Sequence, residues 1–264
     1  MDIFALKLIL TFIVGGLWIT LGTIIAEKYG TKIGGVIAGL PSTVAVTLFF
    51  IGWTQSAQFA SQSTAIVPIV TGISGFFVAV YFLLTKKSFF FALIASLLMW
   101  LVLSLTLVQL NFNNLLYSII GLIFFIVISY FILEIKSKVK SEGKRIIHYT
   151  ATQLAFRGTL GGSIMVLGVF LAKIGGPLIG GAFAAFPAMF LGTIIITHFA
   201  HGKDFSAAVM KVMVLSGTIN VSVYAIAVRY FYILFGLFIG TVLSFAVSLV
   251  TGYLVYLFVL KKMS

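Results

Sequence analysis

With 264 residues, of which 61% are hydrophobic and 8% are charged, this chain lacks the polar surface that a soluble protein of its size exposes. The net charge of +12 lies mostly in short segments between apolar runs, which indicates contact with lipid head groups and not with nucleic acid. Cysteine is absent, which excludes disulfides, thiolate metal sites and cysteine nucleophiles. We therefore predict an all-α polytopic protein embedded in a lipid bilayer.

Nine apolar runs are long enough to cross the membrane, since a helix needs about 20 residues to span the hydrocarbon core. The predicted spans are 4–26, 33–53, 64–84, 88–108, 115–134, 151–173, 178–198, 207–228 and 233–259. The last span is long enough to be one tilted helix or a broken one. Trp100 is expected near a membrane interface, where tryptophan is enriched.

The distribution of lysine and arginine predicts how the chain is oriented. Segment 135–145 is the most basic and is expected in the cytoplasm, whereas the loops TQSAQFASQS and QLNFNN carry no charge and are expected outside. Nine helices then place the N-terminus outside and the C-terminus in the cytoplasm. The expected location is the plasma membrane of a prokaryote, as a multi-pass protein.

An internal duplication relates the two ends of the chain. Residues 30–47 and 176–193 both place a Gly-Gly pair six residues before a proline, and a shift of 146 positions aligns 15 identities over the 56 positions from 4 to 59. The matched pairs in these segments are Gly30 with Gly176, Gly34 with Gly180, Gly35 with Gly181, Pro41 with Pro187 and Thr47 with Thr193.

The duplication predicts two four-helix repeats. Residues 1–108 form the first repeat, 109–146 form a connecting helix with a basic cytoplasmic linker, and 147–264 form the second repeat. Five helices separate equivalent elements, so the second copy is expected to cross the membrane in the opposite sense.

A proline in the middle of a span points to a site, because its neighbours must satisfy the backbone carbonyl that it frees. Ser42 and Thr43 follow Pro41 and can do so, whereas Ala188 and Met189 follow Pro187 and cannot. If both spans unwind, half-helix N-termini point at the membrane middle, where an anionic or carbonyl-rich substrate could bind. The alternative is that the glycines only permit close helix packing and the prolines only kink their helices.

Charged and amide side chains are scarce inside the spans. All five acidic residues fall at helix ends or in loops, which disfavours ion coupling through a buried carboxylate. Arg157 lies within a span and either binds an anion or snorkels to the nearby cytoplasmic surface. Asn220 aligns with Ser74, and both either line a path or join helices by a hydrogen bond. The predicted substrate-binding residues are Pro41, Ser42, Thr43, Thr47, Gly34, Gly35, Pro187, Thr193, Gly180, Gly181, Arg157 and Asn220.

The chain resembles the secondary transporters that are built from inverted repeats with discontinuous helices. Its IAGLPS and FAAFPA segments are also similar to the Gly/Ala-rich span of small four-helix membrane proteins of the GlpM type, of which it looks like a fused duplicate. The first resemblance implies transport of a small solute by rocking of two repeats around a midplane site.

Other functions follow less directly from the residues. A passive channel and a non-transporting scaffold or assembly subunit are the alternatives, and a homodimer remains open. We find no sequence signature of an enzyme and expect no catalytic residue, cofactor or bound metal. The expected partners are the lipid bilayer and a small-molecule or ion substrate, with no nucleic acid.

Overall fold

The computed structural model describes residues 2–28, 36–136 and 149–262. Within these ranges eight helical stretches are long and apolar enough to cross a membrane, and the last of them bends back on itself, giving about nine crossing helices. The described part of the chain contains no strand. The prediction of an all-α, multi-pass membrane protein is confirmed.

The helices follow one another with short connections. The first part of the chain holds α1 (Ile3–Lys28), α3 (Ser42–Thr54), α4 (Ala57–Ser63), α5 (Val67–Leu84), α6 (Phe89–Gln109) and α7 (Leu115–Tyr130), the last continued by a π-helix (Phe131–Lys136). The second part holds α8 (Ala151–Gly175), α9 (Pro177–Ala184), α10 (Ala188–His201) and α11 (Lys203–Lys262).

Polar side chains cap helices that start in the loops. Ser56 accepts a hydrogen bond from the Phe59 amide at the start of α4, and Asn114 accepts one from the Tyr117 amide at the start of α7. Thr150 and the residue three positions after it form a reciprocal capping box at α8. Such caps satisfy N–H groups that have no acceptor within the helix.

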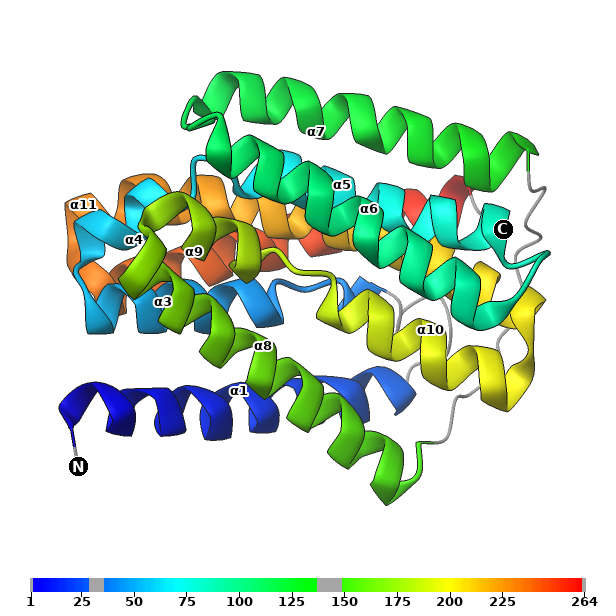
Figure 1. The fold of residues 1–264 in the computed structure, drawn as a ribbon, viewed down its shortest axis with the longest axis horizontal. Coiled ribbons are helices and arrows are strands. Elements are labelled where there is room, and N and C mark those ends of the chain that lie inside the picture. The colour runs from blue at the N-terminus through cyan, green and yellow to red at the C-terminus, as the bar shows by residue number, and fades with distance from the viewer. Residues whose placement is uncertain (1, 29–35, 137–148, 263–264) are drawn as a thin grey trace.

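A glycine reverses the chain within α11. Gly236 has φ 74°, in the left-handed region that favours glycine, and the helix folds back there (Figure 1). The sequence predicts two helices here, 207–228 and 233–259, with the break between 228 and 233. The structure corrects both the break and the start at 207, because hydropathy runs on smoothly to Gly236 and the helix already starts at Lys203.

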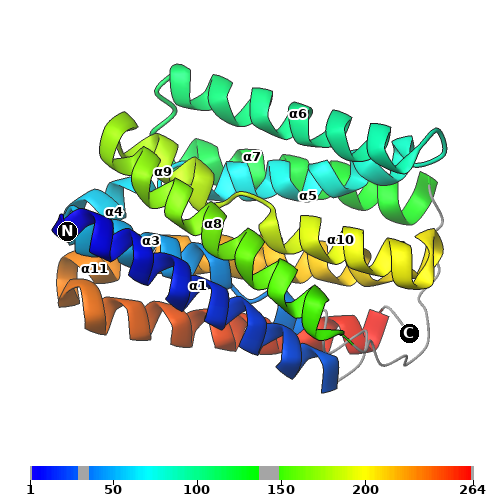
Figure 2. The ribbon, with the colours of Figure 1, turned by 60° about the horizontal axis from the view of Figure 1, so that its bottom comes forward.

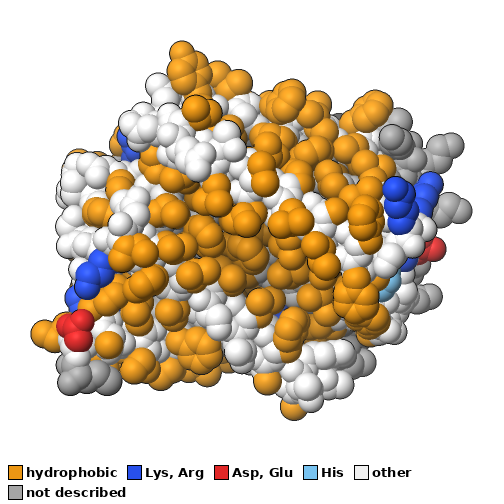
Figure 3. All heavy atoms as spheres, in the orientation of Figure 1, with side chains coloured by type: hydrophobic (Ala, Val, Ile, Leu, Met, Phe, Trp, Pro, Cys, Tyr) orange, Lys and Arg blue, Asp and Glu red, His pale blue; other side chains and the backbone are white. Residues whose placement is uncertain are grey.

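The bundle has a buried interior and a lipid-facing outside. α3, α5 and the α9–α10 stretch are mostly buried, whereas α1, α6 and α7 expose most of their side chains. Figure 3 shows apolar side chains covering the middle of one face, with charged side chains at its two ends. This is the surface expected of a helical bundle that spans a bilayer.

Helices with the same place in the two parts of the chain run in opposite directions. Figures 1 and 2 show α1 crossing α8, α3 and α10 leading from the middle of the bundle toward opposite ends, and the two termini at opposite ends. α6 and α7 cover one side of α5. The interrupted stretches around α3 and α10 therefore meet inside the bundle.

Candidate substrate site

The two prolines interrupt their helices with the same backbone geometry. Pro41 has φ −75° and ψ 48°, and Pro187 has φ −76° and ψ 44°. At each break the amide after the proline bonds to the carbonyl before it, from Ser42 to Leu40 at 2.7 Å and from Ala188 to Phe186 at 2.8 Å. A new helix starts at once, α3 at Ser42 and α10 at Ala188.

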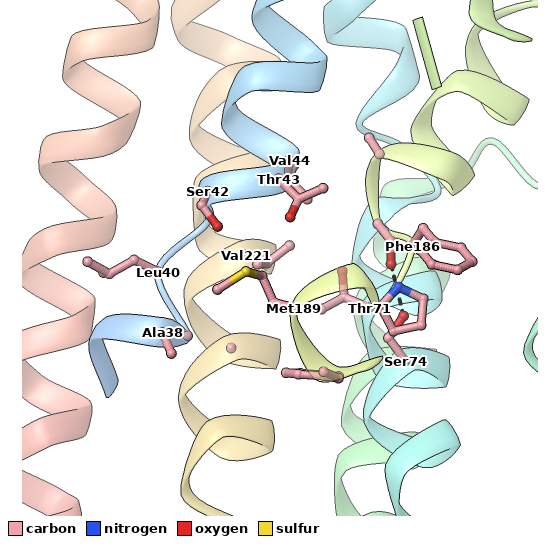
Figure 4. Close-up of a pocket in the computed structure, with 16 residues that line it drawn as sticks. Ala38, Leu40, Ser42, Thr43, Val44, Thr71, Ser74, Phe186, Met189 and Val221 are labelled. Carbon is pink, nitrogen blue, oxygen red and sulfur yellow. Dashed lines mark hydrogen bonds between the residues drawn. The ribbon is translucent and has the colours of Figure 1, made fainter. Parts of the chain in front are cut away.

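A cavity of about 50 Å³ lies between the two breaks (Figure 4). Both interrupted stretches line it, together with α5 and α11. The lining residues are Ala38, Gly39, Leu40, Ser42, Thr43, Val44, Thr71, Ser74, Ala184, Ala185, Phe186, Pro187, Met189, Phe190, Gly217 and Val221. Because one water needs about 10–15 Å³ of such space, the cavity holds a few waters or one compact ion.

The N-termini of α3 and α10 both open onto this cavity without a side-chain cap. The first amide of each helix bonds to the carbonyl of the residue before the proline, and the fourth amide bonds to the carbonyl of the proline. The amides left over belong to Thr43 and Val44 in α3 and to Met189 and Phe190 in α10, and all four residues line the cavity. Two positive helix ends therefore face one small space.

Two buried hydroxyls at the cavity also lack a hydrogen-bond partner. They are Ser42 Oγ, at the start of α3, and Thr71 Oγ1, on α5. The expectation that Ser42 satisfies a carbonyl freed by Pro41 is therefore wrong, because its hydroxyl group makes no such bond. Both hydroxyls remain available as donors or acceptors.

A residue from a different helix satisfies the carbonyl at the second break. Ser74 Oγ of α5 shares its one proton between the Ala185 carbonyl oxygen, at 2.9 Å, and the Val70 carbonyl oxygen of its own helix, at 3.0 Å. It also accepts a 2.9 Å hydrogen bond from Trp100 Nε1 of α6. Trp100 is fully buried, so the prediction that it lies near a membrane interface is wrong. The hydrogen bond to Ser74 and the packing against Phe186 hold the indole inside the bundle. Sequence analysis aligns Ser74 with Asn220 but gives no signal that Trp100 supports the break.

Replacing Ser74 with alanine should destabilise the protein by about 1–3 kcal/mol, because the Trp100 N–H and the Ala185 carbonyl then lose their shared partner inside the bundle. The measurement is the unfolding midpoint in detergent. The matched control is Ser96→Ala on α6, whose buried hydroxyl bonds only to carbonyls of its own helix. Equal shifts in the two variants would contradict this role for Ser74.

The predicted site residues divide between the cavity and its surroundings. Ser42, Thr43 and Pro187 line the cavity, and Pro41 forms the first break. Thr47 lies farther along α3 and donates a hydrogen bond to the Thr43 carbonyl. Five more described members of the set do not line the cavity: Thr193, Gly180, Gly181, Arg157 and Asn220.

Thr193, the equivalent of Thr47, is buried on α10, and its hydroxyl oxygen has no partner. Gly180 and Gly181 permit close helix packing, since a Cβ on them would meet Ala172 of α8 and the Ser63 carbonyl of α4. Gly34 and Gly35 lie outside the described residues.

Asn220 is fully buried on α11, and neither amide atom of its side chain has a hydrogen-bond partner. It faces Gly252 and does not line the cavity. The residues that α11 contributes to the lining are Gly217 and Val221.

Arg157 lies inside the bundle, with 3% of its surface exposed. Its Nη1 donates to the Tyr149 hydroxyl at 3.3 Å, and its Nη2 donates to Met189 Sδ at 3.7 Å. The side chain therefore packs against α10 beside the cavity, contrary to the snorkelling alternative. No acidic side chain in the described part of the chain pairs with it; there, Glu134 pairs with Lys211.

The first part of the chain matches a known sequence family. Residues 8–113 match the model of DUF3147, a family of proteins of unknown function. The match begins in α1 and ends just after α6, so it includes Pro41, Thr71 and Ser74 but none of α7 to α11. No curated protein and no solved structure matches the chain. The resemblances to transporters and to GlpM-type proteins remain predictions.

Proposed function

We propose that this protein carries a small solute across the membrane, with the cavity between α3 and α10 as the substrate site. The observation that carries this proposal is the convergence of two interrupted helices, with uncapped N-termini, on one small cavity inside a lipid-facing bundle. Corresponding interrupted helices are the usual elements of the substrate site in transporters built from repeats. In this proposal the chain is a carrier and not an enzyme.

Reciprocal packing supports an inverted relation between the two repeats. A Cβ on Gly15 of α1 would meet Met165 of α8, and a Cβ on Gly161 of α8 would meet Ile19 of α1. The shift of 146 positions matches Gly15 with Gly161 and Ile19 with Met165, so the two contacts are equivalent with the halves exchanged. Such exchanged contacts are typical of a two-fold axis, and rocking of the halves about it would open the cavity to each side in turn.

The topology that this proposal requires can be tested in the cysteine-free chain. Gln58→Cys in α4 should react with a membrane-impermeant maleimide in intact cells, because α4 is expected outside. Lys203→Cys at the start of α11 should react only after permeabilisation, because this position is expected in the cytoplasm. α4 and the end of α10, which α11 follows directly, lie toward opposite ends of the bundle (Figure 1).

The cysteine-free parent is the control for this labelling and should remain unlabelled. Reaction of both variants from the same side would exclude inverted halves. Reaction of Gln58→Cys only after permeabilisation, with Lys203→Cys reactive in intact cells, would reverse the predicted orientation of the termini.

Flux measurements distinguish the proposed carrier from the other functions. The purified chain in liposomes should exchange a labelled solute in a saturable way and show counterflow, with a panel of small anions and neutral solutes as probes. Flux without counterflow would indicate a channel of the same architecture. Absence of flux together with stable copurification of another chain would indicate a scaffold or assembly subunit.

A further inference from the structure

Unpaired backbone donors in the cavity point to the class of ligand that it takes. Within a membrane, N–H groups without an acceptor are costly, and helix ends that are buried without a cap are completed by water or by a ligand. α3 and α10 are full-length helices of 13 and 14 residues, and neither has a side-chain cap or an acidic residue in its first turn. Their leftover amides and dipoles both favour negative charge.

The Thr71 hydroxyl is an independent observation that points to the same ligand. Thr71 is 4% exposed on α5, its Oγ1 atom has no hydrogen-bond partner, and the residue lines the cavity opposite the start of α3 (Figure 4). A helical threonine usually donates to a carbonyl of the preceding turn, as Thr47 does. Thr71 therefore retains a donor at the cavity, and the lining also includes the unpaired hydroxyl of Ser42.

Arg157 adds positive potential from the side of α10. A buried cation without an acidic partner is strongly disfavoured in a low-dielectric interior. The guanidinium group contacts Met189, which lines the cavity, and no acidic residue belongs to that lining. A negative charge in the cavity would compensate the charge of Arg157.

We propose that the cavity binds a compact anionic group, from the size of a halide ion to that of a carboxylate. The first-turn amides of α3 and α10 and the hydroxyls of Ser42 and Thr71 donate to this group, and Arg157 supplies long-range attraction. The small volume of the cavity, about 50 Å³, favours a compact group. This inference rests on the proposed function, for which it names the class of substrate.

The anionic group has two possible sources, a free ion or the head of an amphiphile. An apolar gap of about 370 Å³ lies between α1, α10 and α11. It shares four lining residues with the cavity: Ala38, Leu40, Ser42 and Met189. An alkyl chain fits such a gap while its carboxylate occupies the cavity. Both sources present the same chemistry to the helix N-termini.

Binding is tested by the unfolding temperature of the purified protein in detergent, since a ligand that binds the folded state stabilises it. Chloride, acetate and decanoate are added as salts of the same cation at equal ionic strength. Gluconate, which is too large for the cavity, serves as the reference anion. We expect at least one of the first three to raise the unfolding temperature in a saturable way. Saturation by acetate or chloride identifies a free anion, and saturation by decanoate alone identifies an amphiphile.

Two variants connect the effect to the cavity. Thr71→Val and Arg157→Gln should each weaken binding at least tenfold, whereas Arg157→Lys should stay within about threefold of the parent. Thr106→Val is the matched control, because that hydroxyl is exposed on α6 and bonds within its own helix. If Arg157→Gln yields no folded protein, Thr71→Val decides the result.

No anion-dependent stabilisation of the parent, or equal stabilisation of the parent and Thr71→Val, would overturn the anion site. If the anion site is overturned in this way but the protein still shows saturable flux of a neutral solute, the carrier function is retained. Anion binding that depends on Thr71, without any flux, would support the site and overturn the carrier function instead.

Discussion

Replacing Pro41 and Pro187 together by alanine should reduce solute flux at least tenfold while leaving the protein folded. Proline disfavours the helix interior by about 3 kcal/mol, and alanine is the best helix former. Alanine also restores an N–H that can bond to the preceding turn. The two stretches would then continue as helices through the breaks, and the amides at the starts of α3 and α10 would find carbonyl acceptors instead of facing the cavity.

The measurements for this double variant are the initial rate of flux in liposomes and the unfolding midpoint in detergent, with the solute that gives the largest parental flux. The matched control is Pro177→Ala, because Pro177 stands in the first turn of α9, where proline interrupts no hydrogen bond. The control should keep parental flux. Equal losses of flux and of folded protein in the double variant would count against a site at the breaks.

Replacing Gly181 with alanine should destabilise the protein by about 3 kcal/mol or more and lower the yield of folded chain. A Cβ on Gly181 would overlap the Ser63 carbonyl oxygen, and this contact is with backbone that cannot rotate away. Overpacking typically costs about 1–3 kcal/mol and occasionally more. We expect a cost at the upper end or above, because α9 and α4 would have to separate.

Gly22→Ala on α1 is the control for Gly181, since a Cβ there meets nothing within 4 Å. It should leave the unfolding midpoint unchanged or slightly raised, because alanine favours helix over glycine. The comparison also decides between packing and substrate binding for Gly181. Parental stability with lost flux in Gly181→Ala would assign it to the substrate site.

The sequence predicts the helices and the two breaks because both depend on local chemistry. Hydropathy reports which segments prefer lipid to water, and a proline interrupts a helix wherever it lies in the interior. Pro41 and Pro187 are therefore visible in the sequence as the points where α3 and α10 begin.

The lining of the cavity could not be predicted, because it depends on how helices are rotated against each other. Thr71 and Ser74 are two of many hydroxyl residues in apolar spans, and nothing in their sequence neighbourhood shows that α5 turns them towards the breaks. The same holds for Trp100, which bonds to Ser74, and for Arg157, whose distance from the helix end suggested exposure. Helix packing settles these directions.

In the proposed arrangement of two repeats, helix α7 has no counterpart in either repeat, and this has a consequence for membrane insertion. A protein that consisted of a single repeat, equivalent to α1–α6, would have to insert in both orientations. The proposed arrangement would then form only if the two orientations were present in equal amounts and paired with each other. One additional crossing between two covalently joined copies fixes the ratio of the two orientations at one to one. Each half is then free to acquire its own pattern of flanking lysines, because orientation is set once for the whole chain during synthesis.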